Sequence, residues 1–157
     1  MSSTQNAFVE MRQILDAALI ANEAIDFLLK MNENGVMCKL ELEKAYDHIN
    51  LDFLPTVMQK MGFGDKWVSW ISWCISTASF LVLINGSPMS FFQNTRGLRQ
   101  EDPILPYLFV IGMEALSCLI NRAVRRGEIR GMGGNGIQVS HLLFADNMLV
   151  FCEVSQQ

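Results

Sequence analysis

The sequence has little positive charge and few charged residues of either sign. Its 12 Lys and Arg residues are outnumbered by 16 Asp and Glu residues, the net charge is −4, and charged residues make up 18% of the chain. Nucleic-acid-binding surfaces usually carry a basic excess, so the composition argues mildly against such a surface within these 157 residues. Half of the residues are apolar, which excludes a disordered chain and is typical of one globular domain.

Paired cysteines and a leader peptide are also missing. Cys38, Cys74, Cys118 and Cys152 lie far apart, without a Cys-x-x-Cys pair. This spacing indicates neither a zinc site nor disulfides, and the apolar neighbours predict reduced thiols in the core. Residues 1–6 lack the charged and apolar regions of a signal peptide. We therefore expect an intracellular protein, in the nucleus or the cytoplasm, that is not secreted and has no disulfides.

No charged residue occurs from Trp67 to Thr95, a stretch long enough to span a bilayer. Serine and threonine residues interrupt its first half, and Asn85-Gly86 with Pro88 places a turn inside it. We therefore expect a buried helix followed by strands, and no membrane partner. The sequence leaves the oligomeric state open.

Apolar periodicity and turn residues predict a mixture of helices and strands. We expect a helix over 7–31 that stops at Asn32, a central strand over 36–42 and a turn-like segment over 43–48. Further helices are expected over 51–61, from the N-cap Asp65 to 76, and over about 106–126. Hairpins are expected across 80–93 and 142–151, with a Gly-rich segment over 127–136. Strands and helices without βαβ alternation indicate an α+β fold.

The second hairpin carries polar residues at its tip. Runs of Leu, Val and Phe flank Ala145-Asp146-Asn147, and Glu41 falls near the end of the predicted central strand. Carboxylates brought together from two strand ends make a hard-oxygen site suited to Mg²⁺, and two such ions can clamp a phosphoryl transfer. In the loop over 95–103, Arg96 and Arg99 are suited to phosphates and the Gly97 turn to close approach by a nucleotide. Solvated strand ends and an ordinary polar loop are the structural alternative.

Three ordered segments carry a family resemblance. Lys39-Leu40-Glu41-Leu42-Glu43-Lys44-Ala45-Tyr46-Asp47 resembles the first catalytic motif of reverse transcriptases from non-LTR (LINE-type) retrotransposons, especially those of plants. Residues 97–109 resemble their Arg-Gln-Gly-Asp-Pro-x-Ser-Pro loop and helix, and Phe144-Ala145-Asp146-Asn147 resembles their Phe-Ala-Asp-Asp hairpin. The likeness runs from about Asn6 to Glu153.

The resemblance implies an RNA-directed DNA polymerase that uses an RNA template, a DNA primer and deoxynucleoside triphosphates. It implies a polymerase palm, an antiparallel sheet with helices packed on one face, plus part of the fingers and no thumb. Residues 6–35 would be a fingers-side helix and 36–157 mainly palm. Glu41 and Asp146 would bind Mg²⁺, with Asn147 as the second catalytic hairpin residue. Tyr46 would pack under the nucleotide sugar, and Arg99 and Gln100 would contact template or nucleotide; Tyr46 as core and Gln100 as loop remain alternatives.

The chain departs from the family pattern where chemistry is most demanding. Glu41 replaces the family Asp, and one extra methylene matters because Mg²⁺ demands octahedral geometry at ~2.0–2.1 Å and a ~1 Å shift can cost ~10²-fold in rate. Asn147 replaces the second hairpin Asp, which removes a charge and a ligand. Glu101 replaces a Gly, Leu105 a Ser and Met11 a Gly. We therefore expect impaired catalysis.

Two alternatives remain open. One is a weakly active enzyme that uses Mn²⁺, whose looser geometric needs would tolerate Glu41. The other is a non-catalytic remnant that binds nucleic acid or protein through Arg122, Arg125, Arg126 and Arg130, although such a cluster is also typical of a solvated helix end. By resemblance, a working enzyme continues into the rest of the palm and a thumb and usually has an upstream endonuclease. We expect the isolated chain to be poorly soluble.

Overall fold

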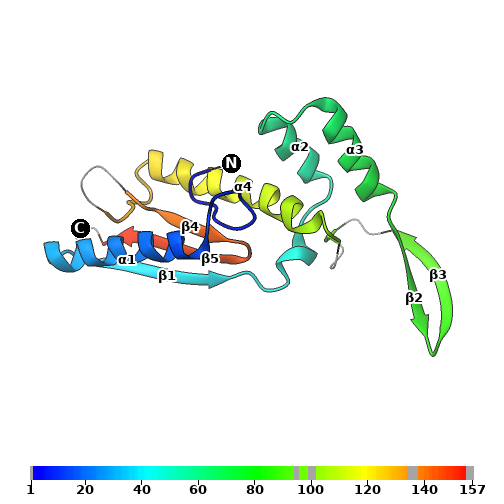
Figure 1. The fold of residues 1–157 in the computed structure, drawn as a ribbon, viewed down its shortest axis with the longest axis horizontal. Coiled ribbons are helices and arrows are strands. Elements are labelled where there is room, and N and C mark those ends of the chain that lie inside the picture. Colours follow the sequence, from blue (N-terminus) through cyan, green and yellow to red (C-terminus); the bar gives the residue numbers. More distant parts are fainter. Residues whose placement is uncertain (1, 94–95, 99–101, 134–137, 155–157) are drawn as a thin grey trace. The chain divides into compact units, whose positions relative to one another are not determined.

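The protein combines helices with antiparallel sheets, which confirms the predicted α+β class (Figure 1). The computed structural model describes residues 2–93, 96–98, 102–133 and 138–154. The chain forms two compact units. The first comprises Met1–Glu43 with Met113–Gln157, and the second comprises Lys44–Gly112.

The first unit is built on a sheet of 3 strands in the order β1-β5-β4. β1 (Gly35–Glu41), β4 (His141–Phe144) and β5 (Asn147–Glu153) pair antiparallel throughout. The hairpin predicted over 142–151 and the strand predicted over 36–42 are confirmed, and β1 begins and ends one residue earlier than predicted. Within the described residues the central position expected for that strand is wrong, because β5 lies between β1 and β4 and β1 is an edge strand there.

The N-terminal residues run along the other edge of this sheet and are not helical. The Asn6 N–H donates to the Leu143 carbonyl at 2.9 Å, and the Leu143 N–H donates to the Thr4 carbonyl at 2.8 Å. α1 therefore spans only Ile14–Met31, and the predicted start at residue 7 is wrong. Asp16 Oδ2 accepts the Gln13 N–H at 2.7 Å, a bond that satisfies a backbone donor at the helix start.

α1 packs against the sheet through small residues. Its buried side chains are Ala17, Ala21, Ala24 and Leu28. Alanines at this spacing let the helix backbone approach the strands closely, and part of this set joins Met132, Leu142 and Phe151 in one core cluster. Several large apolar side chains of the segment predicted as a helix over 7–31 are exposed, and these are Phe8 and Met11 before α1 and Ile14, Leu15 and Leu29 within it.

Helices contact both faces of the sheet. Leu142 lies in the core cluster with α1, whereas its neighbour His141 projects from the opposite face because side chains alternate along a strand. His141 Nε2 lies 2.8 Å from Ser117 Oγ of α4 (Leu105–Arg125). The prediction that helices cover one face only is therefore wrong.

The second unit contains η1 (Ala45–His48), α2 (Phe53–Lys60), α3 (Asp65–Ser76), β2 (Ser79–Ile84) and β3 (Ser87–Gln93). The predicted Asn-Gly hairpin is confirmed, since Asn85 and Gly86 both have positive φ, at 50° and 80°, as a two-residue hairpin turn requires. The N-cap of α3 is Gly64 and not Asp65, which begins the helix.

The uncharged stretch that begins at Trp67 is less buried than expected. In α3 only Val68 and Ile71 are buried, and Trp67, Trp70 and Trp73 are each more than half exposed, at 57%, 52% and 67%. The cysteines also differ from the prediction of core thiols. All four are free, and Cys38, Cys74 and Cys118 are exposed while Cys152 is half-buried.

One described helix, α4, is long and apolar enough to cross a membrane by length and composition alone. Its contacts are those of a core helix. Ser117 is fully buried against His141, and Glu114 Oε1 accepts the Ser2 backbone N–H at 2.7 Å. Core helices of globular proteins commonly satisfy the same length and hydropathy criteria.

Candidate functional site

The sheet brings three predicted site residues together at one end. Glu41 is the last residue of β1 and Asn147 the first of β5, and they are paired in register. The Leu42 N–H donates to the Asp146 carbonyl at 3.1 Å, just beyond that pair. Hydrogen-bonded and non-hydrogen-bonded pairs alternate along antiparallel strands, so Glu41 and Asn147 form the closer, non-hydrogen-bonded kind, with Cα atoms about 4.5 Å apart.

Asp146 lies in the hairpin turn. Phe144 pairs with Asn147, which leaves Ala145 and Asp146 as the two turn residues. Ala145 has φ of 52°, a conformation that normally favours glycine and stores strain of order 1–3 kcal/mol. The turn thus holds a half-buried carboxylate at the strand ends beside the exposed Glu41.

Asn147 is bonded to its neighbour. Its Nδ2 donates to Asp146 Oδ1 at 3.2 Å. An aspartate at this position would have no such donor, and would add a second negative charge. The amide therefore occupies one lone pair of the carboxylate that the predicted metal site depends on.

The donor set is small for a metal centre. Within the described ranges, no group of three His, Cys, Asp or Glu side chains gathers in a metal-binding arrangement. Glu41 and Asp146 are the two carboxylates that would hold a hard cation. Two carboxylates suit one Mg²⁺ ion, which usually keeps several water ligands.

Tyr46 belongs to the second unit, where its ring packs on another aromatic ring. The centroids of Tyr46 and Phe109 lie 4.6 Å apart and the rings are tilted by 45°. This packing agrees with the core alternative for Tyr46. Its role under a nucleotide sugar stays a prediction.

Gly97 lies close to the backbone of Asp47 in the same unit. It has φ of 84°, and an added Cβ would meet Asp47 Cα at 3.0 Å. The Gly97 N–H donates to the Ile49 carbonyl at 2.8 Å. The glycine is therefore required by the fold of the second unit, whereas its approach to a nucleotide stays a prediction. Arg99, Gln100 and Glu101 lie outside the described residues.

Two of the departures from the family motifs are visible. Met11 has φ of 63°, a region that costs a side chain about 1–2 kcal/mol and that glycine adopts freely. Leu105 is only 5% exposed and begins α4, so its apolar side chain is accommodated in the core. Met11 is thus a strained replacement, and Leu105 is not.

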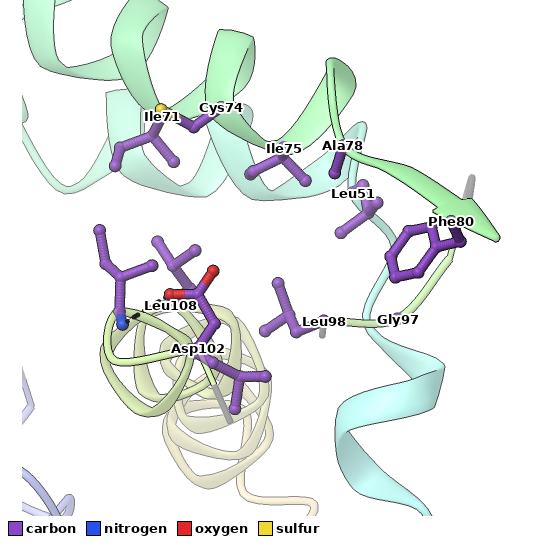
Figure 2. A pocket seen from close by; sticks show the side chains of 12 residues that line it. Leu51, Ile71, Cys74, Ile75, Ala78, Phe80, Gly97, Leu98, Asp102 and Leu108 are labelled. Carbon is purple, nitrogen blue, oxygen red and sulfur yellow. Dashed lines mark hydrogen bonds between the residues drawn. The ribbon is translucent and has the colours of Figure 1, made fainter. Parts of the chain in front are cut away.

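A pocket of about 410 Å³ lies within the second unit (Figure 2). Aliphatic side chains surround the carboxylate of Asp102, whose Oδ1 accepts the Ile104 N–H at 3.1 Å where α4 begins. Gly97, whose turn was predicted to approach a nucleotide, lies in its lining, whereas Glu41, Tyr46, Asp146 and Asn147 do not. The apolar part of its lining includes Leu51, Ile71, Ile75, Phe80, Leu98 and Leu108.

Sequence reasoning missed a polar network behind the hairpin. His141 is fully buried, with Nε2 2.8 Å from Ser117 Oγ and Nδ1 2.9 Å from Ser140 Oγ. Burial lowers the pKa of His141 below its ordinary value of 6.5, so the ring is neutral, and a neutral ring can donate from one nitrogen and accept at the other. The available signal was the Ser140-His141 pair where an apolar strand begins, and periodicity alone does not show what such a pair contacts.

The four arginines near the end of α4 show one ion pair. Arg126 lies 3.7 Å from Glu128, and both side chains are more than half exposed. Exposed pairs of this kind contribute little stability. Glu128 also reduces the net positive charge of the cluster.

Comparison with known proteins gives a consistent result. A model of the family described as "Reverse transcriptase (RNA-dependent DNA polymerase)" matches residues 1–157. An uncharacterized mitochondrial protein of Arabidopsis thaliana is 45% identical over 69 residues, which cover 43% of this chain and 57% of that protein. An uncharacterized 149 kDa protein of transposon TX1 from Xenopus laevis is 26% identical over 75% of this chain and 9% of its own length.

A third relative is the retrovirus-related Pol polyprotein of the type-1 retrotransposable element R2 from Popillia japonica. It is 22% identical over 93% of this chain and 20% of its own length. The chain thus spans between 9% and 57% of the length of these relatives. The family match, in contrast, covers the whole chain, and it includes both the strand that ends in Glu41 and the hairpin that carries Asp146. The chain belongs to the reverse transcriptase (RNA-dependent DNA polymerase) family.

Proposed function

We propose that this chain is part of a retrotransposon-encoded RNA-directed DNA polymerase whose nucleotidyl-transfer site is impaired. Residues 6–35 would be a fingers-side helix and residues 36–157 mainly palm, with an RNA template, a DNA primer and deoxynucleoside triphosphates as substrates. The observation that carries the proposal is the meeting of Glu41, Asp146 and Asn147 at one end of the sheet. The relatives named for transposable elements support the retrotransposon origin.

The impairment follows from the donors at that end of the sheet. Bound Mg²⁺ would activate the primer hydroxyl and neutralise phosphate charge. Glu41 and Asp146 would hold the ion, and Asn147 offers an amide in place of a third carboxylate while it bonds to Asp146 Oδ1. Fewer negative ligands weaken the binding of a hard cation. Mn²⁺ would be the better ion for the longer Glu41 side chain.

Primer extension on an RNA template tests the proposal. The chain would be compared with the triple variant Glu41→Asp, Glu101→Gly, Asn147→Asp, both alone and joined to the downstream polymerase segment of a retrotransposon relative. We expect no extension with Mg²⁺ from the unsubstituted chain and measurable extension from the joined triple variant. Efficient extension by the unsubstituted chain with Mg²⁺ would overturn the impairment, and a silent joined triple variant would show that these three positions are not the lesions.

Metal binding gives a readout that does not depend on activity. Titration of Mn²⁺, followed by electron paramagnetic resonance, reports the ion in the absence of substrate. Asp146→Ala should abolish the binding if the proposed donors are correct. Asp26→Ala is a matched control, because Asp26 lies on the exposed side of α1. Equal loss in both variants would contradict the site.

A further inference from the structure

The segment that precedes α1, residues 2–12, is bound along the edge of β4. Gln5 forms an isolated parallel bridge with Leu143. The Leu143 N–H donates to the Thr4 carbonyl at 2.8 Å, and the Asn6 N–H donates to the Leu143 carbonyl at 2.9 Å. We call residues 2–12 the strap, because this single bridge is its sheet pairing among the described residues.

A buried network of hydroxyl groups joins the strap to α4 and β4. Ser2 Oγ donates to Glu114 Oε2 at 3.3 Å, and Ser117 Oγ donates to Ser2 Oγ at 3.1 Å. Thr4 Oγ1 lies 2.9 Å from the same Ser117 Oγ. A carboxylate only accepts, so the bonds run toward Glu114, and His141 Nε2 donates to Ser117 Oγ across 2.8 Å. The strap thus supplies two of the hydroxyl groups that connect His141 to a carboxylate.

The closed strap contains three unfavourable features. Phe8 and Met11 have positive φ, at 52° and 63°, a region that strains a residue with a Cβ. The Gln5 side chain is fully buried, and its Nε2 has no hydrogen-bond partner among the described residues. A buried donor without an acceptor is destabilising, and water satisfies it when the segment opens. Opening of the strap therefore relieves all three costs at once.

Among the described residues, no charged group contacts the fully buried ring of His141. Three charged groups face it from the surrounding elements. Glu114 of α4 is two hydroxyl groups away, Arg12 of the strap bonds the Ser2 carbonyl, and Glu23 of α1 lines the same cavity of about 580 Å³. The residue paired with His141 in β5 is the uncharged Val150. A proton added to the ring would therefore be a buried charge without an ion-pair partner.

We propose that the strap is released from β4 when His141 is protonated. In the neutral ring Nδ1 accepts a hydrogen bond from Ser140 Oγ, 2.9 Å away, and protonation turns this acceptor into a second donor. Departure of Ser2 and Thr4 lets water reach the charged ring through the adjoining cavity, which is large enough to hold water.

The strap opens before the sheet does, because it is the more weakly held of the two. It has one bridge to β4, whereas β4 and β5 are paired at 4 positions. The bonds that break belong to residues 2–6 themselves, so opening does not require the chain to begin at residue 1.

Proton linkage gives the sign and the size of the effect. Burial lowers the pKa of His141 in the closed state, and the ring regains its ordinary pKa of about 6.5 when the strap is open. Acid therefore favours the open state. The equilibrium constant for opening should rise by about 10-fold between pH 7.5 and pH 5.5.

Hydrogen exchange of individual amides in the full chain, followed by NMR, measures the opening. Asn6 and Leu143 report on the strap, and Phe151, whose N–H donates to the Ser140 carbonyl at 2.8 Å, reports on the pairing of β4 with β5. At pH 7.5 the two strap amides should be at least about 10-fold less protected than Phe151. Their protection, corrected for intrinsic exchange rates, should fall by about 10-fold at pH 5.5. Equal protection of all three amides would overturn the proposal, because the strap would then open only with the whole unit.

Two histidine variants identify the group that titrates. His141→Gln should remove the 10-fold change in the protection of the strap amides. His48→Gln is the control and should retain the change, because His48 is exposed. A full 10-fold change that survives in His141→Gln would overturn the role of His141.

A hydroxyl variant tests the network at pH 7.5 and does not depend on the folding of His141→Gln. Thr4→Val removes one hydroxyl group and keeps the Thr4 carbonyl that β4 uses. It should lower the protection of the Asn6 amide at least about 3-fold and leave Phe151 unchanged. Ser3→Val is the matched control, because Ser3 is exposed and lies outside the network. Equal protection of Asn6 in the two variants would overturn the network as the anchor of the strap.

Discussion

Asn147 Nδ2 donates a hydrogen bond to Asp146 Oδ1 across 3.2 Å, at the end of the sheet where Glu41 also lies. Because of this bond, a substitution at Asn147 should change both metal binding by the hairpin and the stability of the hairpin. The amide stabilises the Asp146 carboxylate in the absence of any cation, a role that a second carboxylate could not fill.

Asn147→Asp should therefore strengthen metal binding and weaken the metal-free fold. We expect Mn²⁺ affinity to rise by about 10-fold, because a charged ligand replaces an amide that had used one lone pair of the Asp146 carboxylate. In EDTA the melting temperature should fall, since two adjacent carboxylates repel each other, and Mn²⁺ should restore it. Asn147→Ala is the control, because it removes the hydrogen bond without adding charge. Unchanged Mn²⁺ affinity in Asn147→Asp would count against the hairpin as a metal ligand.

The buried His141 should make stability depend on pH. Its pKa is lowered in the folded protein by burial, so the unfolded chain binds the proton more readily. The contribution is fully present above about pH 6.5 and is lost as the pH falls below that value, by at most about 1.4 kcal/mol per pH unit. Urea unfolding between pH 5 and pH 8, a range that extends about 1.5 units to each side of the ordinary pKa, measures this contribution.

His141→Gln should flatten that pH dependence, and His48→Gln should not. His48 is exposed at the end of η1, and these are the two histidines of the chain. A slope that survives His141→Gln would assign the dependence to other groups.

Gly97→Ala should destabilise the protein more than Gly86→Ala. Both glycines have positive φ, at 84° and 80°, so both substitutions incur the same conformational strain. Only at Gly97 would the added Cβ meet backbone atoms, with Asp47 Cα at 3.0 Å, whereas nothing lies within 4 Å at Gly86. We expect the difference in unfolding free energy to be about 1–3 kcal/mol, measured by urea denaturation. Equal losses of unfolding free energy in the two variants would show that the backbone at Asp47 moves to accommodate the added Cβ at little cost.

Met11→Gly should stabilise the protein. Met11 is 92% exposed and has φ of 63°, so its side chain adds little packing and its backbone is strained. Relief of about 1–2 kcal/mol, reduced by the greater freedom of glycine in the unfolded chain, leaves a gain of about 0.5–1 kcal/mol. Met11→Ala retains the Cβ and should give no gain. A stabilising Met11→Ala would mean that backbone strain is not the cause.

Local patterns predicted most elements of this protein. The Asn85-Gly86 turn, the stop of α1 at Asn32 and the apolar runs around Asp146 depend on neighbours in the chain, and each prediction is confirmed. Periodicity did not predict which side of an amphipathic segment is buried. Ile14, Leu15, Leu19 and Leu29 of α1 face water, whereas Ala17, Ala21 and Ala24 are buried with Leu28, because close packing against strands favours small residues.

For the candidate site too, part could be predicted from the sequence and part could not. Motif resemblance alone identified Glu41, Asp146 and Asn147, and the order of the motifs indicated the family. Only the tertiary structure showed that β5 lies between β1 and β4, because strand order depends on pairing between segments that are distant in sequence. That order placed Asn147 opposite Glu41 and, within the described residues, left β1 at an edge. The sequence by itself determined which residues could do the chemistry, and strand pairing decided which of them meet.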